Sequence, residues 1–178
     1  TPLGIDPGCT PYFGWQLHSE TPDTRQIACR LQVCAPGGKV LWDTGRQETG
    51  RASFVPYAGP ALCPRTRYTW TVTAWDNHGG TAAAASWFET ALAPADWQAA
   101  WMRTPRAYVQ RQKGFGTQPP ATLFRRSFTL DAAPAAARLY LTCLGVYRLT
   151  VNGQRPDDRE FAPEHTSYRN TLCYQSYD

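Results

Sequence analysis

The chain has 178 residues and a formal net charge of +4, from 18 basic and 14 acidic side chains spread along its length. No run of Lys or Arg forms the basic patch of a nucleic-acid-binding protein, and no apolar stretch approaches the roughly 18 residues of a membrane span. We therefore expect neither nucleic acid nor a membrane as a partner. With 42% hydrophobic residues the chain can bury one or two cores, which excludes disorder throughout.

The six cysteines do not show the C-x-x-C spacing of a zinc site or a redox centre. Cys29 and Cys34 lie an odd number of residues apart in one alternating run, so they are expected on opposite faces of a strand and should not pair. We expect buried or half-buried free thiols, no metal and no cofactor. Free thiols favour a cytoplasmic compartment slightly over an exported one, and the compartment stays open because the sequence does not tell whether a leader was removed before Thr1.

Residues 1–92 read as one all-β domain. Period-two alternation is clearest at 27–33 and 68–74, and Gly- or Pro-containing turns follow every 8–12 residues. About seven short strands at this spacing predict a β-sandwich. The segments expected to be extended are 11–17, 27–33, 40–42, 53–57, 68–74 and 86–90.

A spaced pattern in this half resembles the strand-pair signature of fibronectin type III domains. The resemblance implies that Leu62 and Tyr68 form a corner that ties a loop to the sheet. It implies a fold and no activity, since such domains serve as spacers, binders and scaffolds. The pattern consists of Leu62, Pro64, Thr66, Tyr68, Val72 and Ala74.

Residues 93–178 read as a second, partial β-domain that follows a small, Pro-marked linker at 91–95. Asp96 is placed to cap a single helical turn, and 105–120 is a long aperiodic loop. Amphipathic alternation predicts strands, and Asn152-Gly153 predicts a two-residue hairpin turn. The expected strands are 123–130, 139–144, 147–151 and 173–177.

Several ordered motifs together resemble the N-terminal part of a bacterial α-L-rhamnosidase. His165 departs from the family, which usually carries an aromatic or another bulky residue there. The fold implied is a fibronectin type III-like β-sandwich followed by the start of a jelly-roll-like, galactose-binding-like domain. The motifs are Pro2-Leu-Gly-Ile-Asp6, Trp42-Asp-Thr-Gly45, Phe88-Glu-Thr90, Ala95-Asp-Trp-Gln-Ala-Ala-Trp101, Ala137-Arg-Leu-Tyr140, Leu144-Gly-Val-Tyr147, Val151-Asn-Gly153, Ala162-Pro-Glu-His-Thr-Ser-Tyr168 and Tyr174-Gln-Ser-Tyr-Asp178.

The resemblance also implies that this chain lacks the catalytic groups. Such enzymes hydrolyse terminal α-L-rhamnosyl bonds with inversion, which needs two carboxyl groups about 6.5–9.5 Å apart. In the family these acids lie in a helical toroid far downstream, and no helical periodicity appears here. Asp157, Asp158 and Glu160 are the most concentrated acids, but they follow a hairpin in a loop where acids are usually solvated. We expect no catalytic residue in this chain.

Two groups of side chains allow a binding interpretation beside a structural one. Arg125, Arg126 and Arg111 form either an anion site or, as we favour, a solvated sheet face. The tryptophans form either a sugar platform or part of the packing. We assign Trp15 and Trp70 to the core, leave Trp42 and Trp75 open, and place Trp97 and Trp101 where aromatics often wedge two domains.

The favoured function is a non-catalytic scaffold whose partner is the catalytic domain of the same polypeptide. Rhamnose-containing glycans would then be contacted only through the full enzyme. The alternatives are an independent carbohydrate-binding module and a fibronectin-like adhesion or receptor fragment. Because about four strands with open edges would make half a sandwich, we expect the second domain to pair with a second copy or to be less ordered than residues 1–92.

Overall fold

The computed structural model describes residues 2–105 and 121–178, and the following statements concern those residues. The chain is all-β apart from one short 3-10 turn, which confirms the predicted fold class. It divides into two compact units, one comprising Thr1–Asp96 with Arg138–Asp178 and the other Trp97–Ala137. The predicted division after residue 92 stays a prediction. In the described residues no helix has the length and apolarity needed to cross a bilayer.

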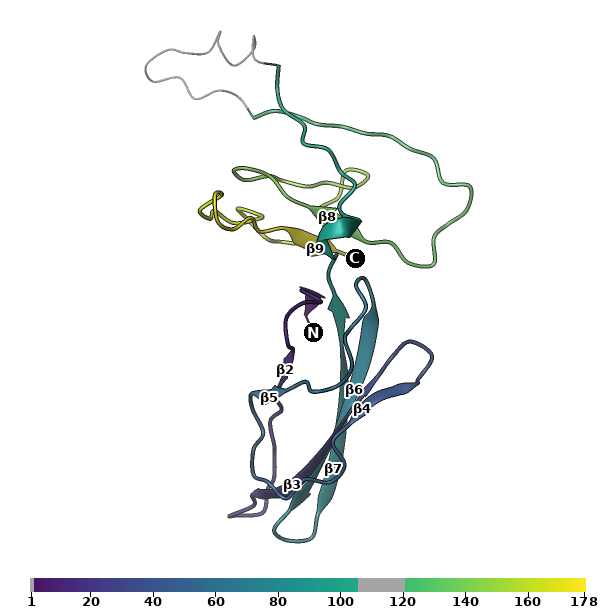
Figure 1. The fold of residues 1–178 in the computed structure, drawn as a ribbon. Helices are drawn as coiled ribbons and strands as arrows, with labels where there is room; N and C mark the ends of the chain where they lie inside the picture. Colours follow the sequence, from purple (N-terminus) through teal and green to yellow (C-terminus); the bar gives the residue numbers. More distant parts are fainter. Residues whose placement is uncertain (1, 106–120) are drawn as a thin grey trace. The chain divides into compact units, whose positions relative to one another are not determined.

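One five-stranded sheet forms the larger layer of the first unit, in the order β1-β7-β6-β3-β4 (Figure 1). The long strands β3, β6 and β7 are antiparallel neighbours, whereas β1 runs parallel to β7. The strands are β1 (Leu3–Ile5), β3 (Gln26–Cys34), β4 (Val40–Asp43), β6 (Arg67–Asp76) and β7 (Thr81–Thr90).

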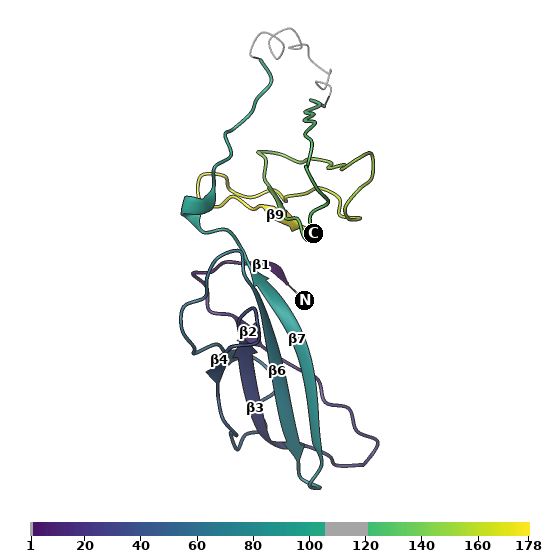
Figure 2. The ribbon, with the colours of Figure 1, turned by 90° about the vertical axis from the view of Figure 1, so that its right-hand side faces the viewer.

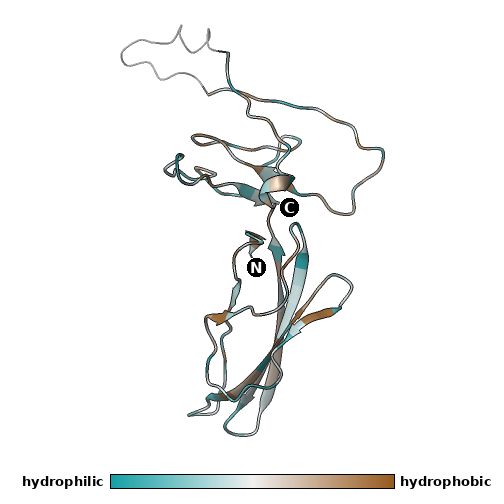
Figure 3. Ribbon diagram, viewed as in Figure 1, coloured by the Kyte–Doolittle hydropathy of each residue, from teal (hydrophilic) through white to brown (hydrophobic). Residues whose placement is uncertain are grey.

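A small antiparallel pair, β2 (Tyr12–Phe13) and β5 (Val55–Pro56), lies against one face of this sheet (Figures 1 and 2). The apolar core fills the space between the two layers, as a β-sandwich requires. Figure 3 shows apolar segments on β4 and in the β2–β5 layer. The buried core residues are Phe13, Cys29, Leu31, Val33, Leu62, Tyr68, Val72 and Phe88.

The predicted tyrosine corner is present. Leu62 and Tyr68 are both buried, and the Tyr68 hydroxyl accepts a hydrogen bond from the backbone N–H of Cys63 at 2.8 Å. The strand that carries Tyr68 is thereby fastened to the loop that leads into it. The spacing of Leu62 and Tyr68 is informative because it places the Leu62 side chain in the core and brings the Tyr68 hydroxyl to the backbone N–H of Cys63.

The second region of this unit is built on two short strands, β8 (Leu139–Leu141) and β9 (Gln175–Tyr177), paired antiparallel. The predicted Asn152-Gly153 turn is confirmed, because both residues have positive φ, 52° and 82°, as a two-residue hairpin turn needs. Val151 and Gln154 exchange backbone hydrogen bonds at 2.8 and 3.0 Å across it. The expected strands 139–144 and 173–177 are present in shortened form, as β8 and β9. The expected strand 147–151 forms only isolated bridges, at Tyr147 and at Val151.

The predicted strand at 123–130 is wrong. The segment has no regular ladder and all eight of its side chains are exposed. Alternating apolar and polar residues give a strand one face to bury. A strand also needs a neighbouring strand that hydrogen-bonds its backbone N–H and C=O groups. The expected strand at 11–17 is likewise limited to β2, because β5 offers it only two partner residues.

The position of Asp96 in its helical turn also needs correction. The 3-10 turn is Pro94–Asp96, so Asp96 ends it and does not begin it. Its carboxylate reaches back to accept a hydrogen bond from the Ala93 N–H at 3.0 Å, which is the acidic half of a capping box. The expected loop at 105–120 lies outside the described residues except for Pro105.

The six cysteines are free thiols, as predicted, but not all are covered. Cys29 is buried, and Cys34, Cys143 and Cys173 are half-buried. Cys9 and Cys63 are exposed, which contradicts the expected burial of these two. Both lie outside the strands, so the alternating hydrophobic pattern gave no information about their burial.

Candidate functional site

The most connected set of polar side chains lies where β7 ends, beside β8 and β9. Glu89 is the penultimate residue of β7 and is flanked by Arg67 of β6 and by Leu3 of β1 in the sheet register. Its side chain is only 9% exposed. A carboxylate so far removed from water must find charged or hydrogen-bonding partners, because burial alone would favour its neutral form.

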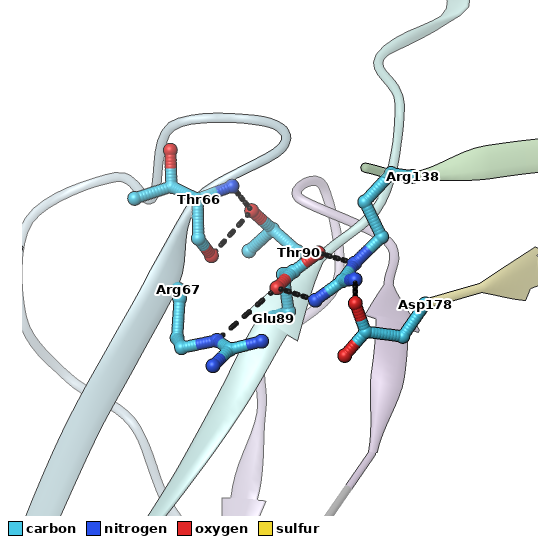
Figure 4. Close-up of polar contacts among 6 residues, drawn as sticks. All are labelled: Thr66, Arg67, Glu89, Thr90, Arg138 and Asp178. Carbon is cyan, nitrogen blue, oxygen red and sulfur yellow. Dashed lines mark hydrogen bonds and ion pairs between the residues drawn. The ribbon is translucent and has the colours of Figure 1, made fainter. Parts of the chain in front are cut away.

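Arg138 supplies those partners through a two-pronged contact (Figure 4). Its Nε donates to Glu89 Oε1 at 2.5 Å and its Nη2 donates to Glu89 Oε2 at 2.8 Å. Arg67 Nε adds a third donor to Oε2 at 3.3 Å. The flat guanidinium matches both carboxylate oxygens at once, which is the geometry in which an Arg–carboxylate pair is strongest.

The cluster is completed by the last residue of the sequence. Arg138 Nη1 donates to Asp178 Oδ1, so this arginine holds two carboxylates (Figure 4). Arg138 directly precedes β8 and Asp178 directly follows β9, and the ladder register places them opposite each other. Opposite charges facing each other across two strands stabilise that pairing. The ion cluster (Arg67, Glu89, Arg138 and Asp178) thus joins β7 to the β8–β9 pair.

The charge states in this cluster are set by the contacts. The hydrogen bonds from Arg138 lower the pKa of Glu89, against the opposing effect of burial. The bonds to Glu89 and then to Asp178 raise the pKa of Arg138. Glu89 therefore stays an ionised carboxylate at neutral pH and cannot donate a proton as a general acid. The arrangement is suited to holding elements together and not to proton transfer.

A second contact beside the cluster fixes the loop before β6. Thr90 is fully buried, and its Oγ1 accepts a hydrogen bond from the Thr66 N–H at 3.0 Å (Figure 4). The same Oγ1 donates to the Cys63 carbonyl at 2.6 Å. This is the same loop that the Tyr68 hydroxyl holds. The end of β7 thus fastens the sandwich on one side through Thr90 and the β8–β9 pair on the other through Glu89.

The β8–β9 pair carries a further polar contact on its other face. The hydroxyls of Tyr147 and Tyr177 lie 2.8 Å apart, and Tyr177 is buried. Burial raises the pKa of Tyr147, with a further contribution from the hydrogen bond with Tyr177. The Tyr147 phenol is therefore neutral, and the two hydroxyls form a hydrogen-bonded contact in a region with few fully buried apolar side chains.

The acids singled out in the sequence lie apart from this cluster. Glu160 accepts a hydrogen bond from Arg155 at 2.7 Å, and this bond lowers its pKa. Asp157 forms an ion pair with Arg159 at 3.3 Å, whereas Asp158 is exposed. They occupy a surface loop near the hairpin turn. The absence of a catalytic role for them stays a prediction.

The candidate binding side chains are also dispersed. Arg125 and Arg126 are exposed in the segment that forms no strand, and Arg111 lies outside the described residues. His165 contacts the Tyr168 ring, with centroids 5.1 Å apart. Among the residues that the structure describes, no group of three His, Cys, Asp or Glu side chains is placed to hold a metal ion.

Most of the tryptophans are engaged in packing. Trp15, Trp42 and Trp70 lie against the core, and Trp15 also donates from Nε1 to Gln26 Oε1 at 2.8 Å. The faces of Trp75 and Trp87 are covered by guanidinium groups, those of Arg46 at 4.7 Å and Arg67 at 4.1 Å from the ring centroids. Trp97 is half-buried, whereas Trp101 is 64% exposed.

The sequence interpretation missed the ion cluster, although a signal was present. Glu89, Arg138 and Asp178 each stand inside one of the motifs quoted for the family resemblance. Glu89 is also a lone acid between Phe88 and Thr90, in a strand end that is otherwise uncharged. An acid in such a position implies a buried cationic partner. Which of the 18 basic residues supplies it cannot be read from one sequence.

Residues 1–94 match the model of the Rha78A-like, N-terminal immunoglobulin domain, and residues 132–178 match the α-L-rhamnosidase N-terminal domain. The chain is 31% identical over 198 aligned residues to the α-L-rhamnosidase of Streptomyces avermitilis, covering 99% of this chain and 19% of that protein.

Solved structures give the same relationship. The α-L-rhamnosidase of Dictyoglumus thermophilum superposes with a TM-score of 0.81 at 28% identity, over 99% of this chain and 22% of that one. The α-L-rhamnosidase of Aspergillus terreus superposes with a TM-score of 0.75 at 26% identity, over 100% of this chain and 20% of that one. The chain thus spans about a fifth of the length of the relatives it matches.

Proposed function

We propose a non-catalytic scaffold role for this chain, which belongs to the α-L-rhamnosidase family and corresponds to its N-terminal region. In this role the ion cluster holds the β-sandwich and the β8–β9 pair together, and residues 1–178 present both to the remainder of a longer polypeptide. The partner is the catalytic portion of that polypeptide. Its activity is the release of terminal α-L-rhamnose, and rhamnose-containing glycans are contacted through the full enzyme.

The ion cluster is the observation that carries this proposal. The most buried acid in the described part of the chain, Glu89, is bound by Arg138 and Arg67 and is held ionised. A glycosidase acid must instead be protonated and face a substrate, with a second carboxyl group about 6.5–9.5 Å away for inversion. The Glu89 carboxylate instead accepts three hydrogen bonds, two from Arg138 and one from Arg67, which supports a structural role.

An independent carbohydrate-binding module receives less support from the aromatic side chains. Sugar platforms need a flat, uncovered ring, but Trp75 and Trp87 are covered by guanidinium groups and Trp42 packs edge-on against Tyr57. An adhesion or receptor fragment has no observation of its own in favour. Both remain outcomes of the experiment below, as does pairing of the second region with another copy of the chain.

The test compares hydrolysis of p-nitrophenyl α-L-rhamnoside by this chain and by a longer polypeptide that carries these residues at its N-terminus. We expect activity only in the longer polypeptide. Glu89→Gln in that polypeptide should shorten the half-life of activity on heating and leave KM unchanged, because the change weakens a structural contact. Hydrolysis by residues 1–178 alone would overturn the proposal.

The alternatives have their own readouts in the same samples. Heat released on titrating L-rhamnose into residues 1–178 would favour a carbohydrate-binding module. Light scattering that gives twice the chain mass of 19.9 kDa would favour pairing with a second copy. The scaffold proposal expects neither result.

A further inference from the structure

Two half-buried cysteines, Cys143 and Cys173, lie just beyond the same end of the β8–β9 ladder. Leu139 faces Tyr177 and Leu141 faces Gln175 in the register. The ladder ends at Leu141 and Gln175, and continuing its register by two residues on each strand sets Cys143 opposite Cys173. Both thiols are free in the structure.

The two chain segments stay together beyond the last regular ladder pair. Thr142 Oγ1 donates to the Cys173 carbonyl at 2.7 Å, so the backbone of one cysteine is tied to the residue that precedes the other. Directly opposed residues of antiparallel strands have Cα atoms about 4.5 or 5.5 Å apart. Both spacings fall inside the range of about 4.4–6.8 Å that disulfides span. With the register continued to 143 and 173, this spacing suits a disulfide between the two cysteines.

We propose that Cys143 and Cys173 form a cross-strand disulfide under oxidising conditions, a modification site that closes the β8–β9 pair at the end opposite the ion cluster. The two ends of the ladder would then be held by different means. Arg138 and Asp178 form an ion pair at one end, and a covalent bond joins the strands at the other. This inference does not depend on the proposed scaffold function.

The chemistry is thiol–disulfide exchange with a small disulfide such as oxidised glutathione. Cys173 lines an open cavity of about 260 Å³, together with Leu172, Tyr174 and Arg159, so a small disulfide can reach it. The Cys173 thiolate attacks one sulfur of the reagent and releases the first glutathione thiol. The Cys143 thiolate then attacks the Cys173 sulfur of the mixed disulfide and releases the second. Two protein thiols are oxidised and one disulfide is reduced to two thiols, which balances electrons and protons.

The order of attack follows from the surroundings of the two sulfurs. Burial raises the pKa of the Cys143 thiol, so less of it is thiolate at neutral pH. Cys143 is therefore suited to the second, intramolecular step, and Cys173, which lines the open cavity, to the first.

Peptide mapping of the full 178-residue chain tests the pairing directly. Trypsin places every cysteine on a different peptide, with Cys143 in 139–148 and Cys173 in 170–178. The chain is incubated with oxidised glutathione, quenched with iodoacetamide and digested without reduction. We expect 139–148 joined to 170–178 as the main cross-linked product. Recovery of these two peptides separately alkylated, or a dominant link through the exposed Cys9 or Cys63, would overturn the proposal.

Hydrogen exchange supplies a second readout. Closing the loop from 143 to 173 restricts the unfolded form of this region, so exchange in β8 and β9 should be about tenfold or more slower in the oxidised protein than in the reduced protein. Cys143→Ser and Cys173→Ser should abolish this slowing, whereas Cys34→Ser, at another half-buried cysteine, should retain it. A slowing that survives both substitutions at the pair would contradict the assignment. The peptide map of the unaltered chain decides the question even if a variant fails to fold.

Discussion

The β3–β6–β7 sheet and the region of residues 138–178 are held together by different forces. The three sheet strands are nine or ten residues long and enclose a continuous apolar core that includes Leu31 and Val33, which are 1% and 0% exposed. In contrast, β8 and β9 have three residues each, and the apolar residues buried there are Ala162, Pro163 and Tyr177. The first region has the burial of an independent fold, and the second depends on polar contacts.

The difference shows what the ion cluster contributes. A short two-stranded ladder is marginal in water by itself. The β8–β9 pair is attached to β7 through Glu89 and Arg138 and is braced by the Tyr147–Tyr177 hydroxyl contact. We infer that the stability of residues 138–178 is conditional on β7 being folded, whereas the sandwich does not need the second region in return.

The largest expected effect tests the sandwich side of this comparison. Leu31→Ala removes a side chain packed between the two layers and should lower the free energy of unfolding by about 2–5 kcal/mol. Since β8–β9 depends on β7, hydrogen exchange should show loss of protection in both regions. Leu17→Ala, at a position 47% exposed, is the control and should change stability little. Retained protection of β8–β9 in the Leu31 variant would contradict the dependence.

A smaller and more local effect is expected at the cluster. Glu89→Gln removes the charge that Arg138 and Arg67 bind. It should lower the free energy of local unfolding of the β8–β9 region by about 2–3 kcal/mol. Hydrogen exchange should accelerate in β8 and β9 while β3 and β6 stay protected. Glu48→Gln is the matched control, because that acid is 68% exposed in its pair with Arg46 and surface pairs contribute little. Equal loss of protection in β3 would show that the two regions unfold as one.

Acid should weaken the ion cluster at Glu89 and also the Asp43–Arg30 ion pair in the sandwich. The pKa of Glu89 lies below its ordinary 4.5, chiefly through Arg138, and hydrogen bonding to Arg30 lowers the pKa of Asp43 from 3.8 to about 2. A depressed pKa means stability that is complete above the unfolded-state value and is lost as pH falls through the folded-state value. The melting temperature should therefore drop between pH 4.5 and 2 because of these groups. In Glu89→Gln the drop should be shallower, and an unchanged slope would argue against the cluster.

The smallest effect compares one turn in each region. Gly37 and Gly153 both have φ of +82° with no atom within 4 Å of an added Cβ, so alanine at either position costs only backbone strain, about 1 kcal/mol. Gly37→Ala lies between β3 and β4 and should lower the global melting temperature. Gly153→Ala should instead accelerate exchange at 147–154 alone. A global shift from Gly153→Ala would mean that the hairpin is more tightly coupled to the sandwich than we infer.

Local chemistry made much of the fold predictable. The β3 and β6 alternation, the Tyr68 corner and the Asn152-Gly153 turn each depend on residues close in sequence. β7 was predicted only from residue 86, because Ala82–Ala85 have low strand propensity and are held there by their pairing with β6. The segment at 123–130 shows the converse, an alternating pattern without a partner strand.

The candidate site was not predictable in the same way. Glu89 and Arg138 are 49 residues apart, and their contact depends on how two folded regions meet. Nothing in the local sequence of either residue selects the other. The motifs quoted for the family resemblance contained both, but as positions in a pattern and not as a charged pair.

The parallel pairing of β1 with β7 has a consequence for how the molecule is made. Ile5 pairs with Thr90, which leaves the ribosome 85 residues later, or roughly 4–17 s at ordinary elongation rates. During that interval Leu3 and Ile5 have no strand to join, while β3, β4 and β6 already follow one another along the chain. β1 therefore precedes the other strands of this sheet along the chain but is the last of them to be placed, and the sheet is completed at its β1 edge.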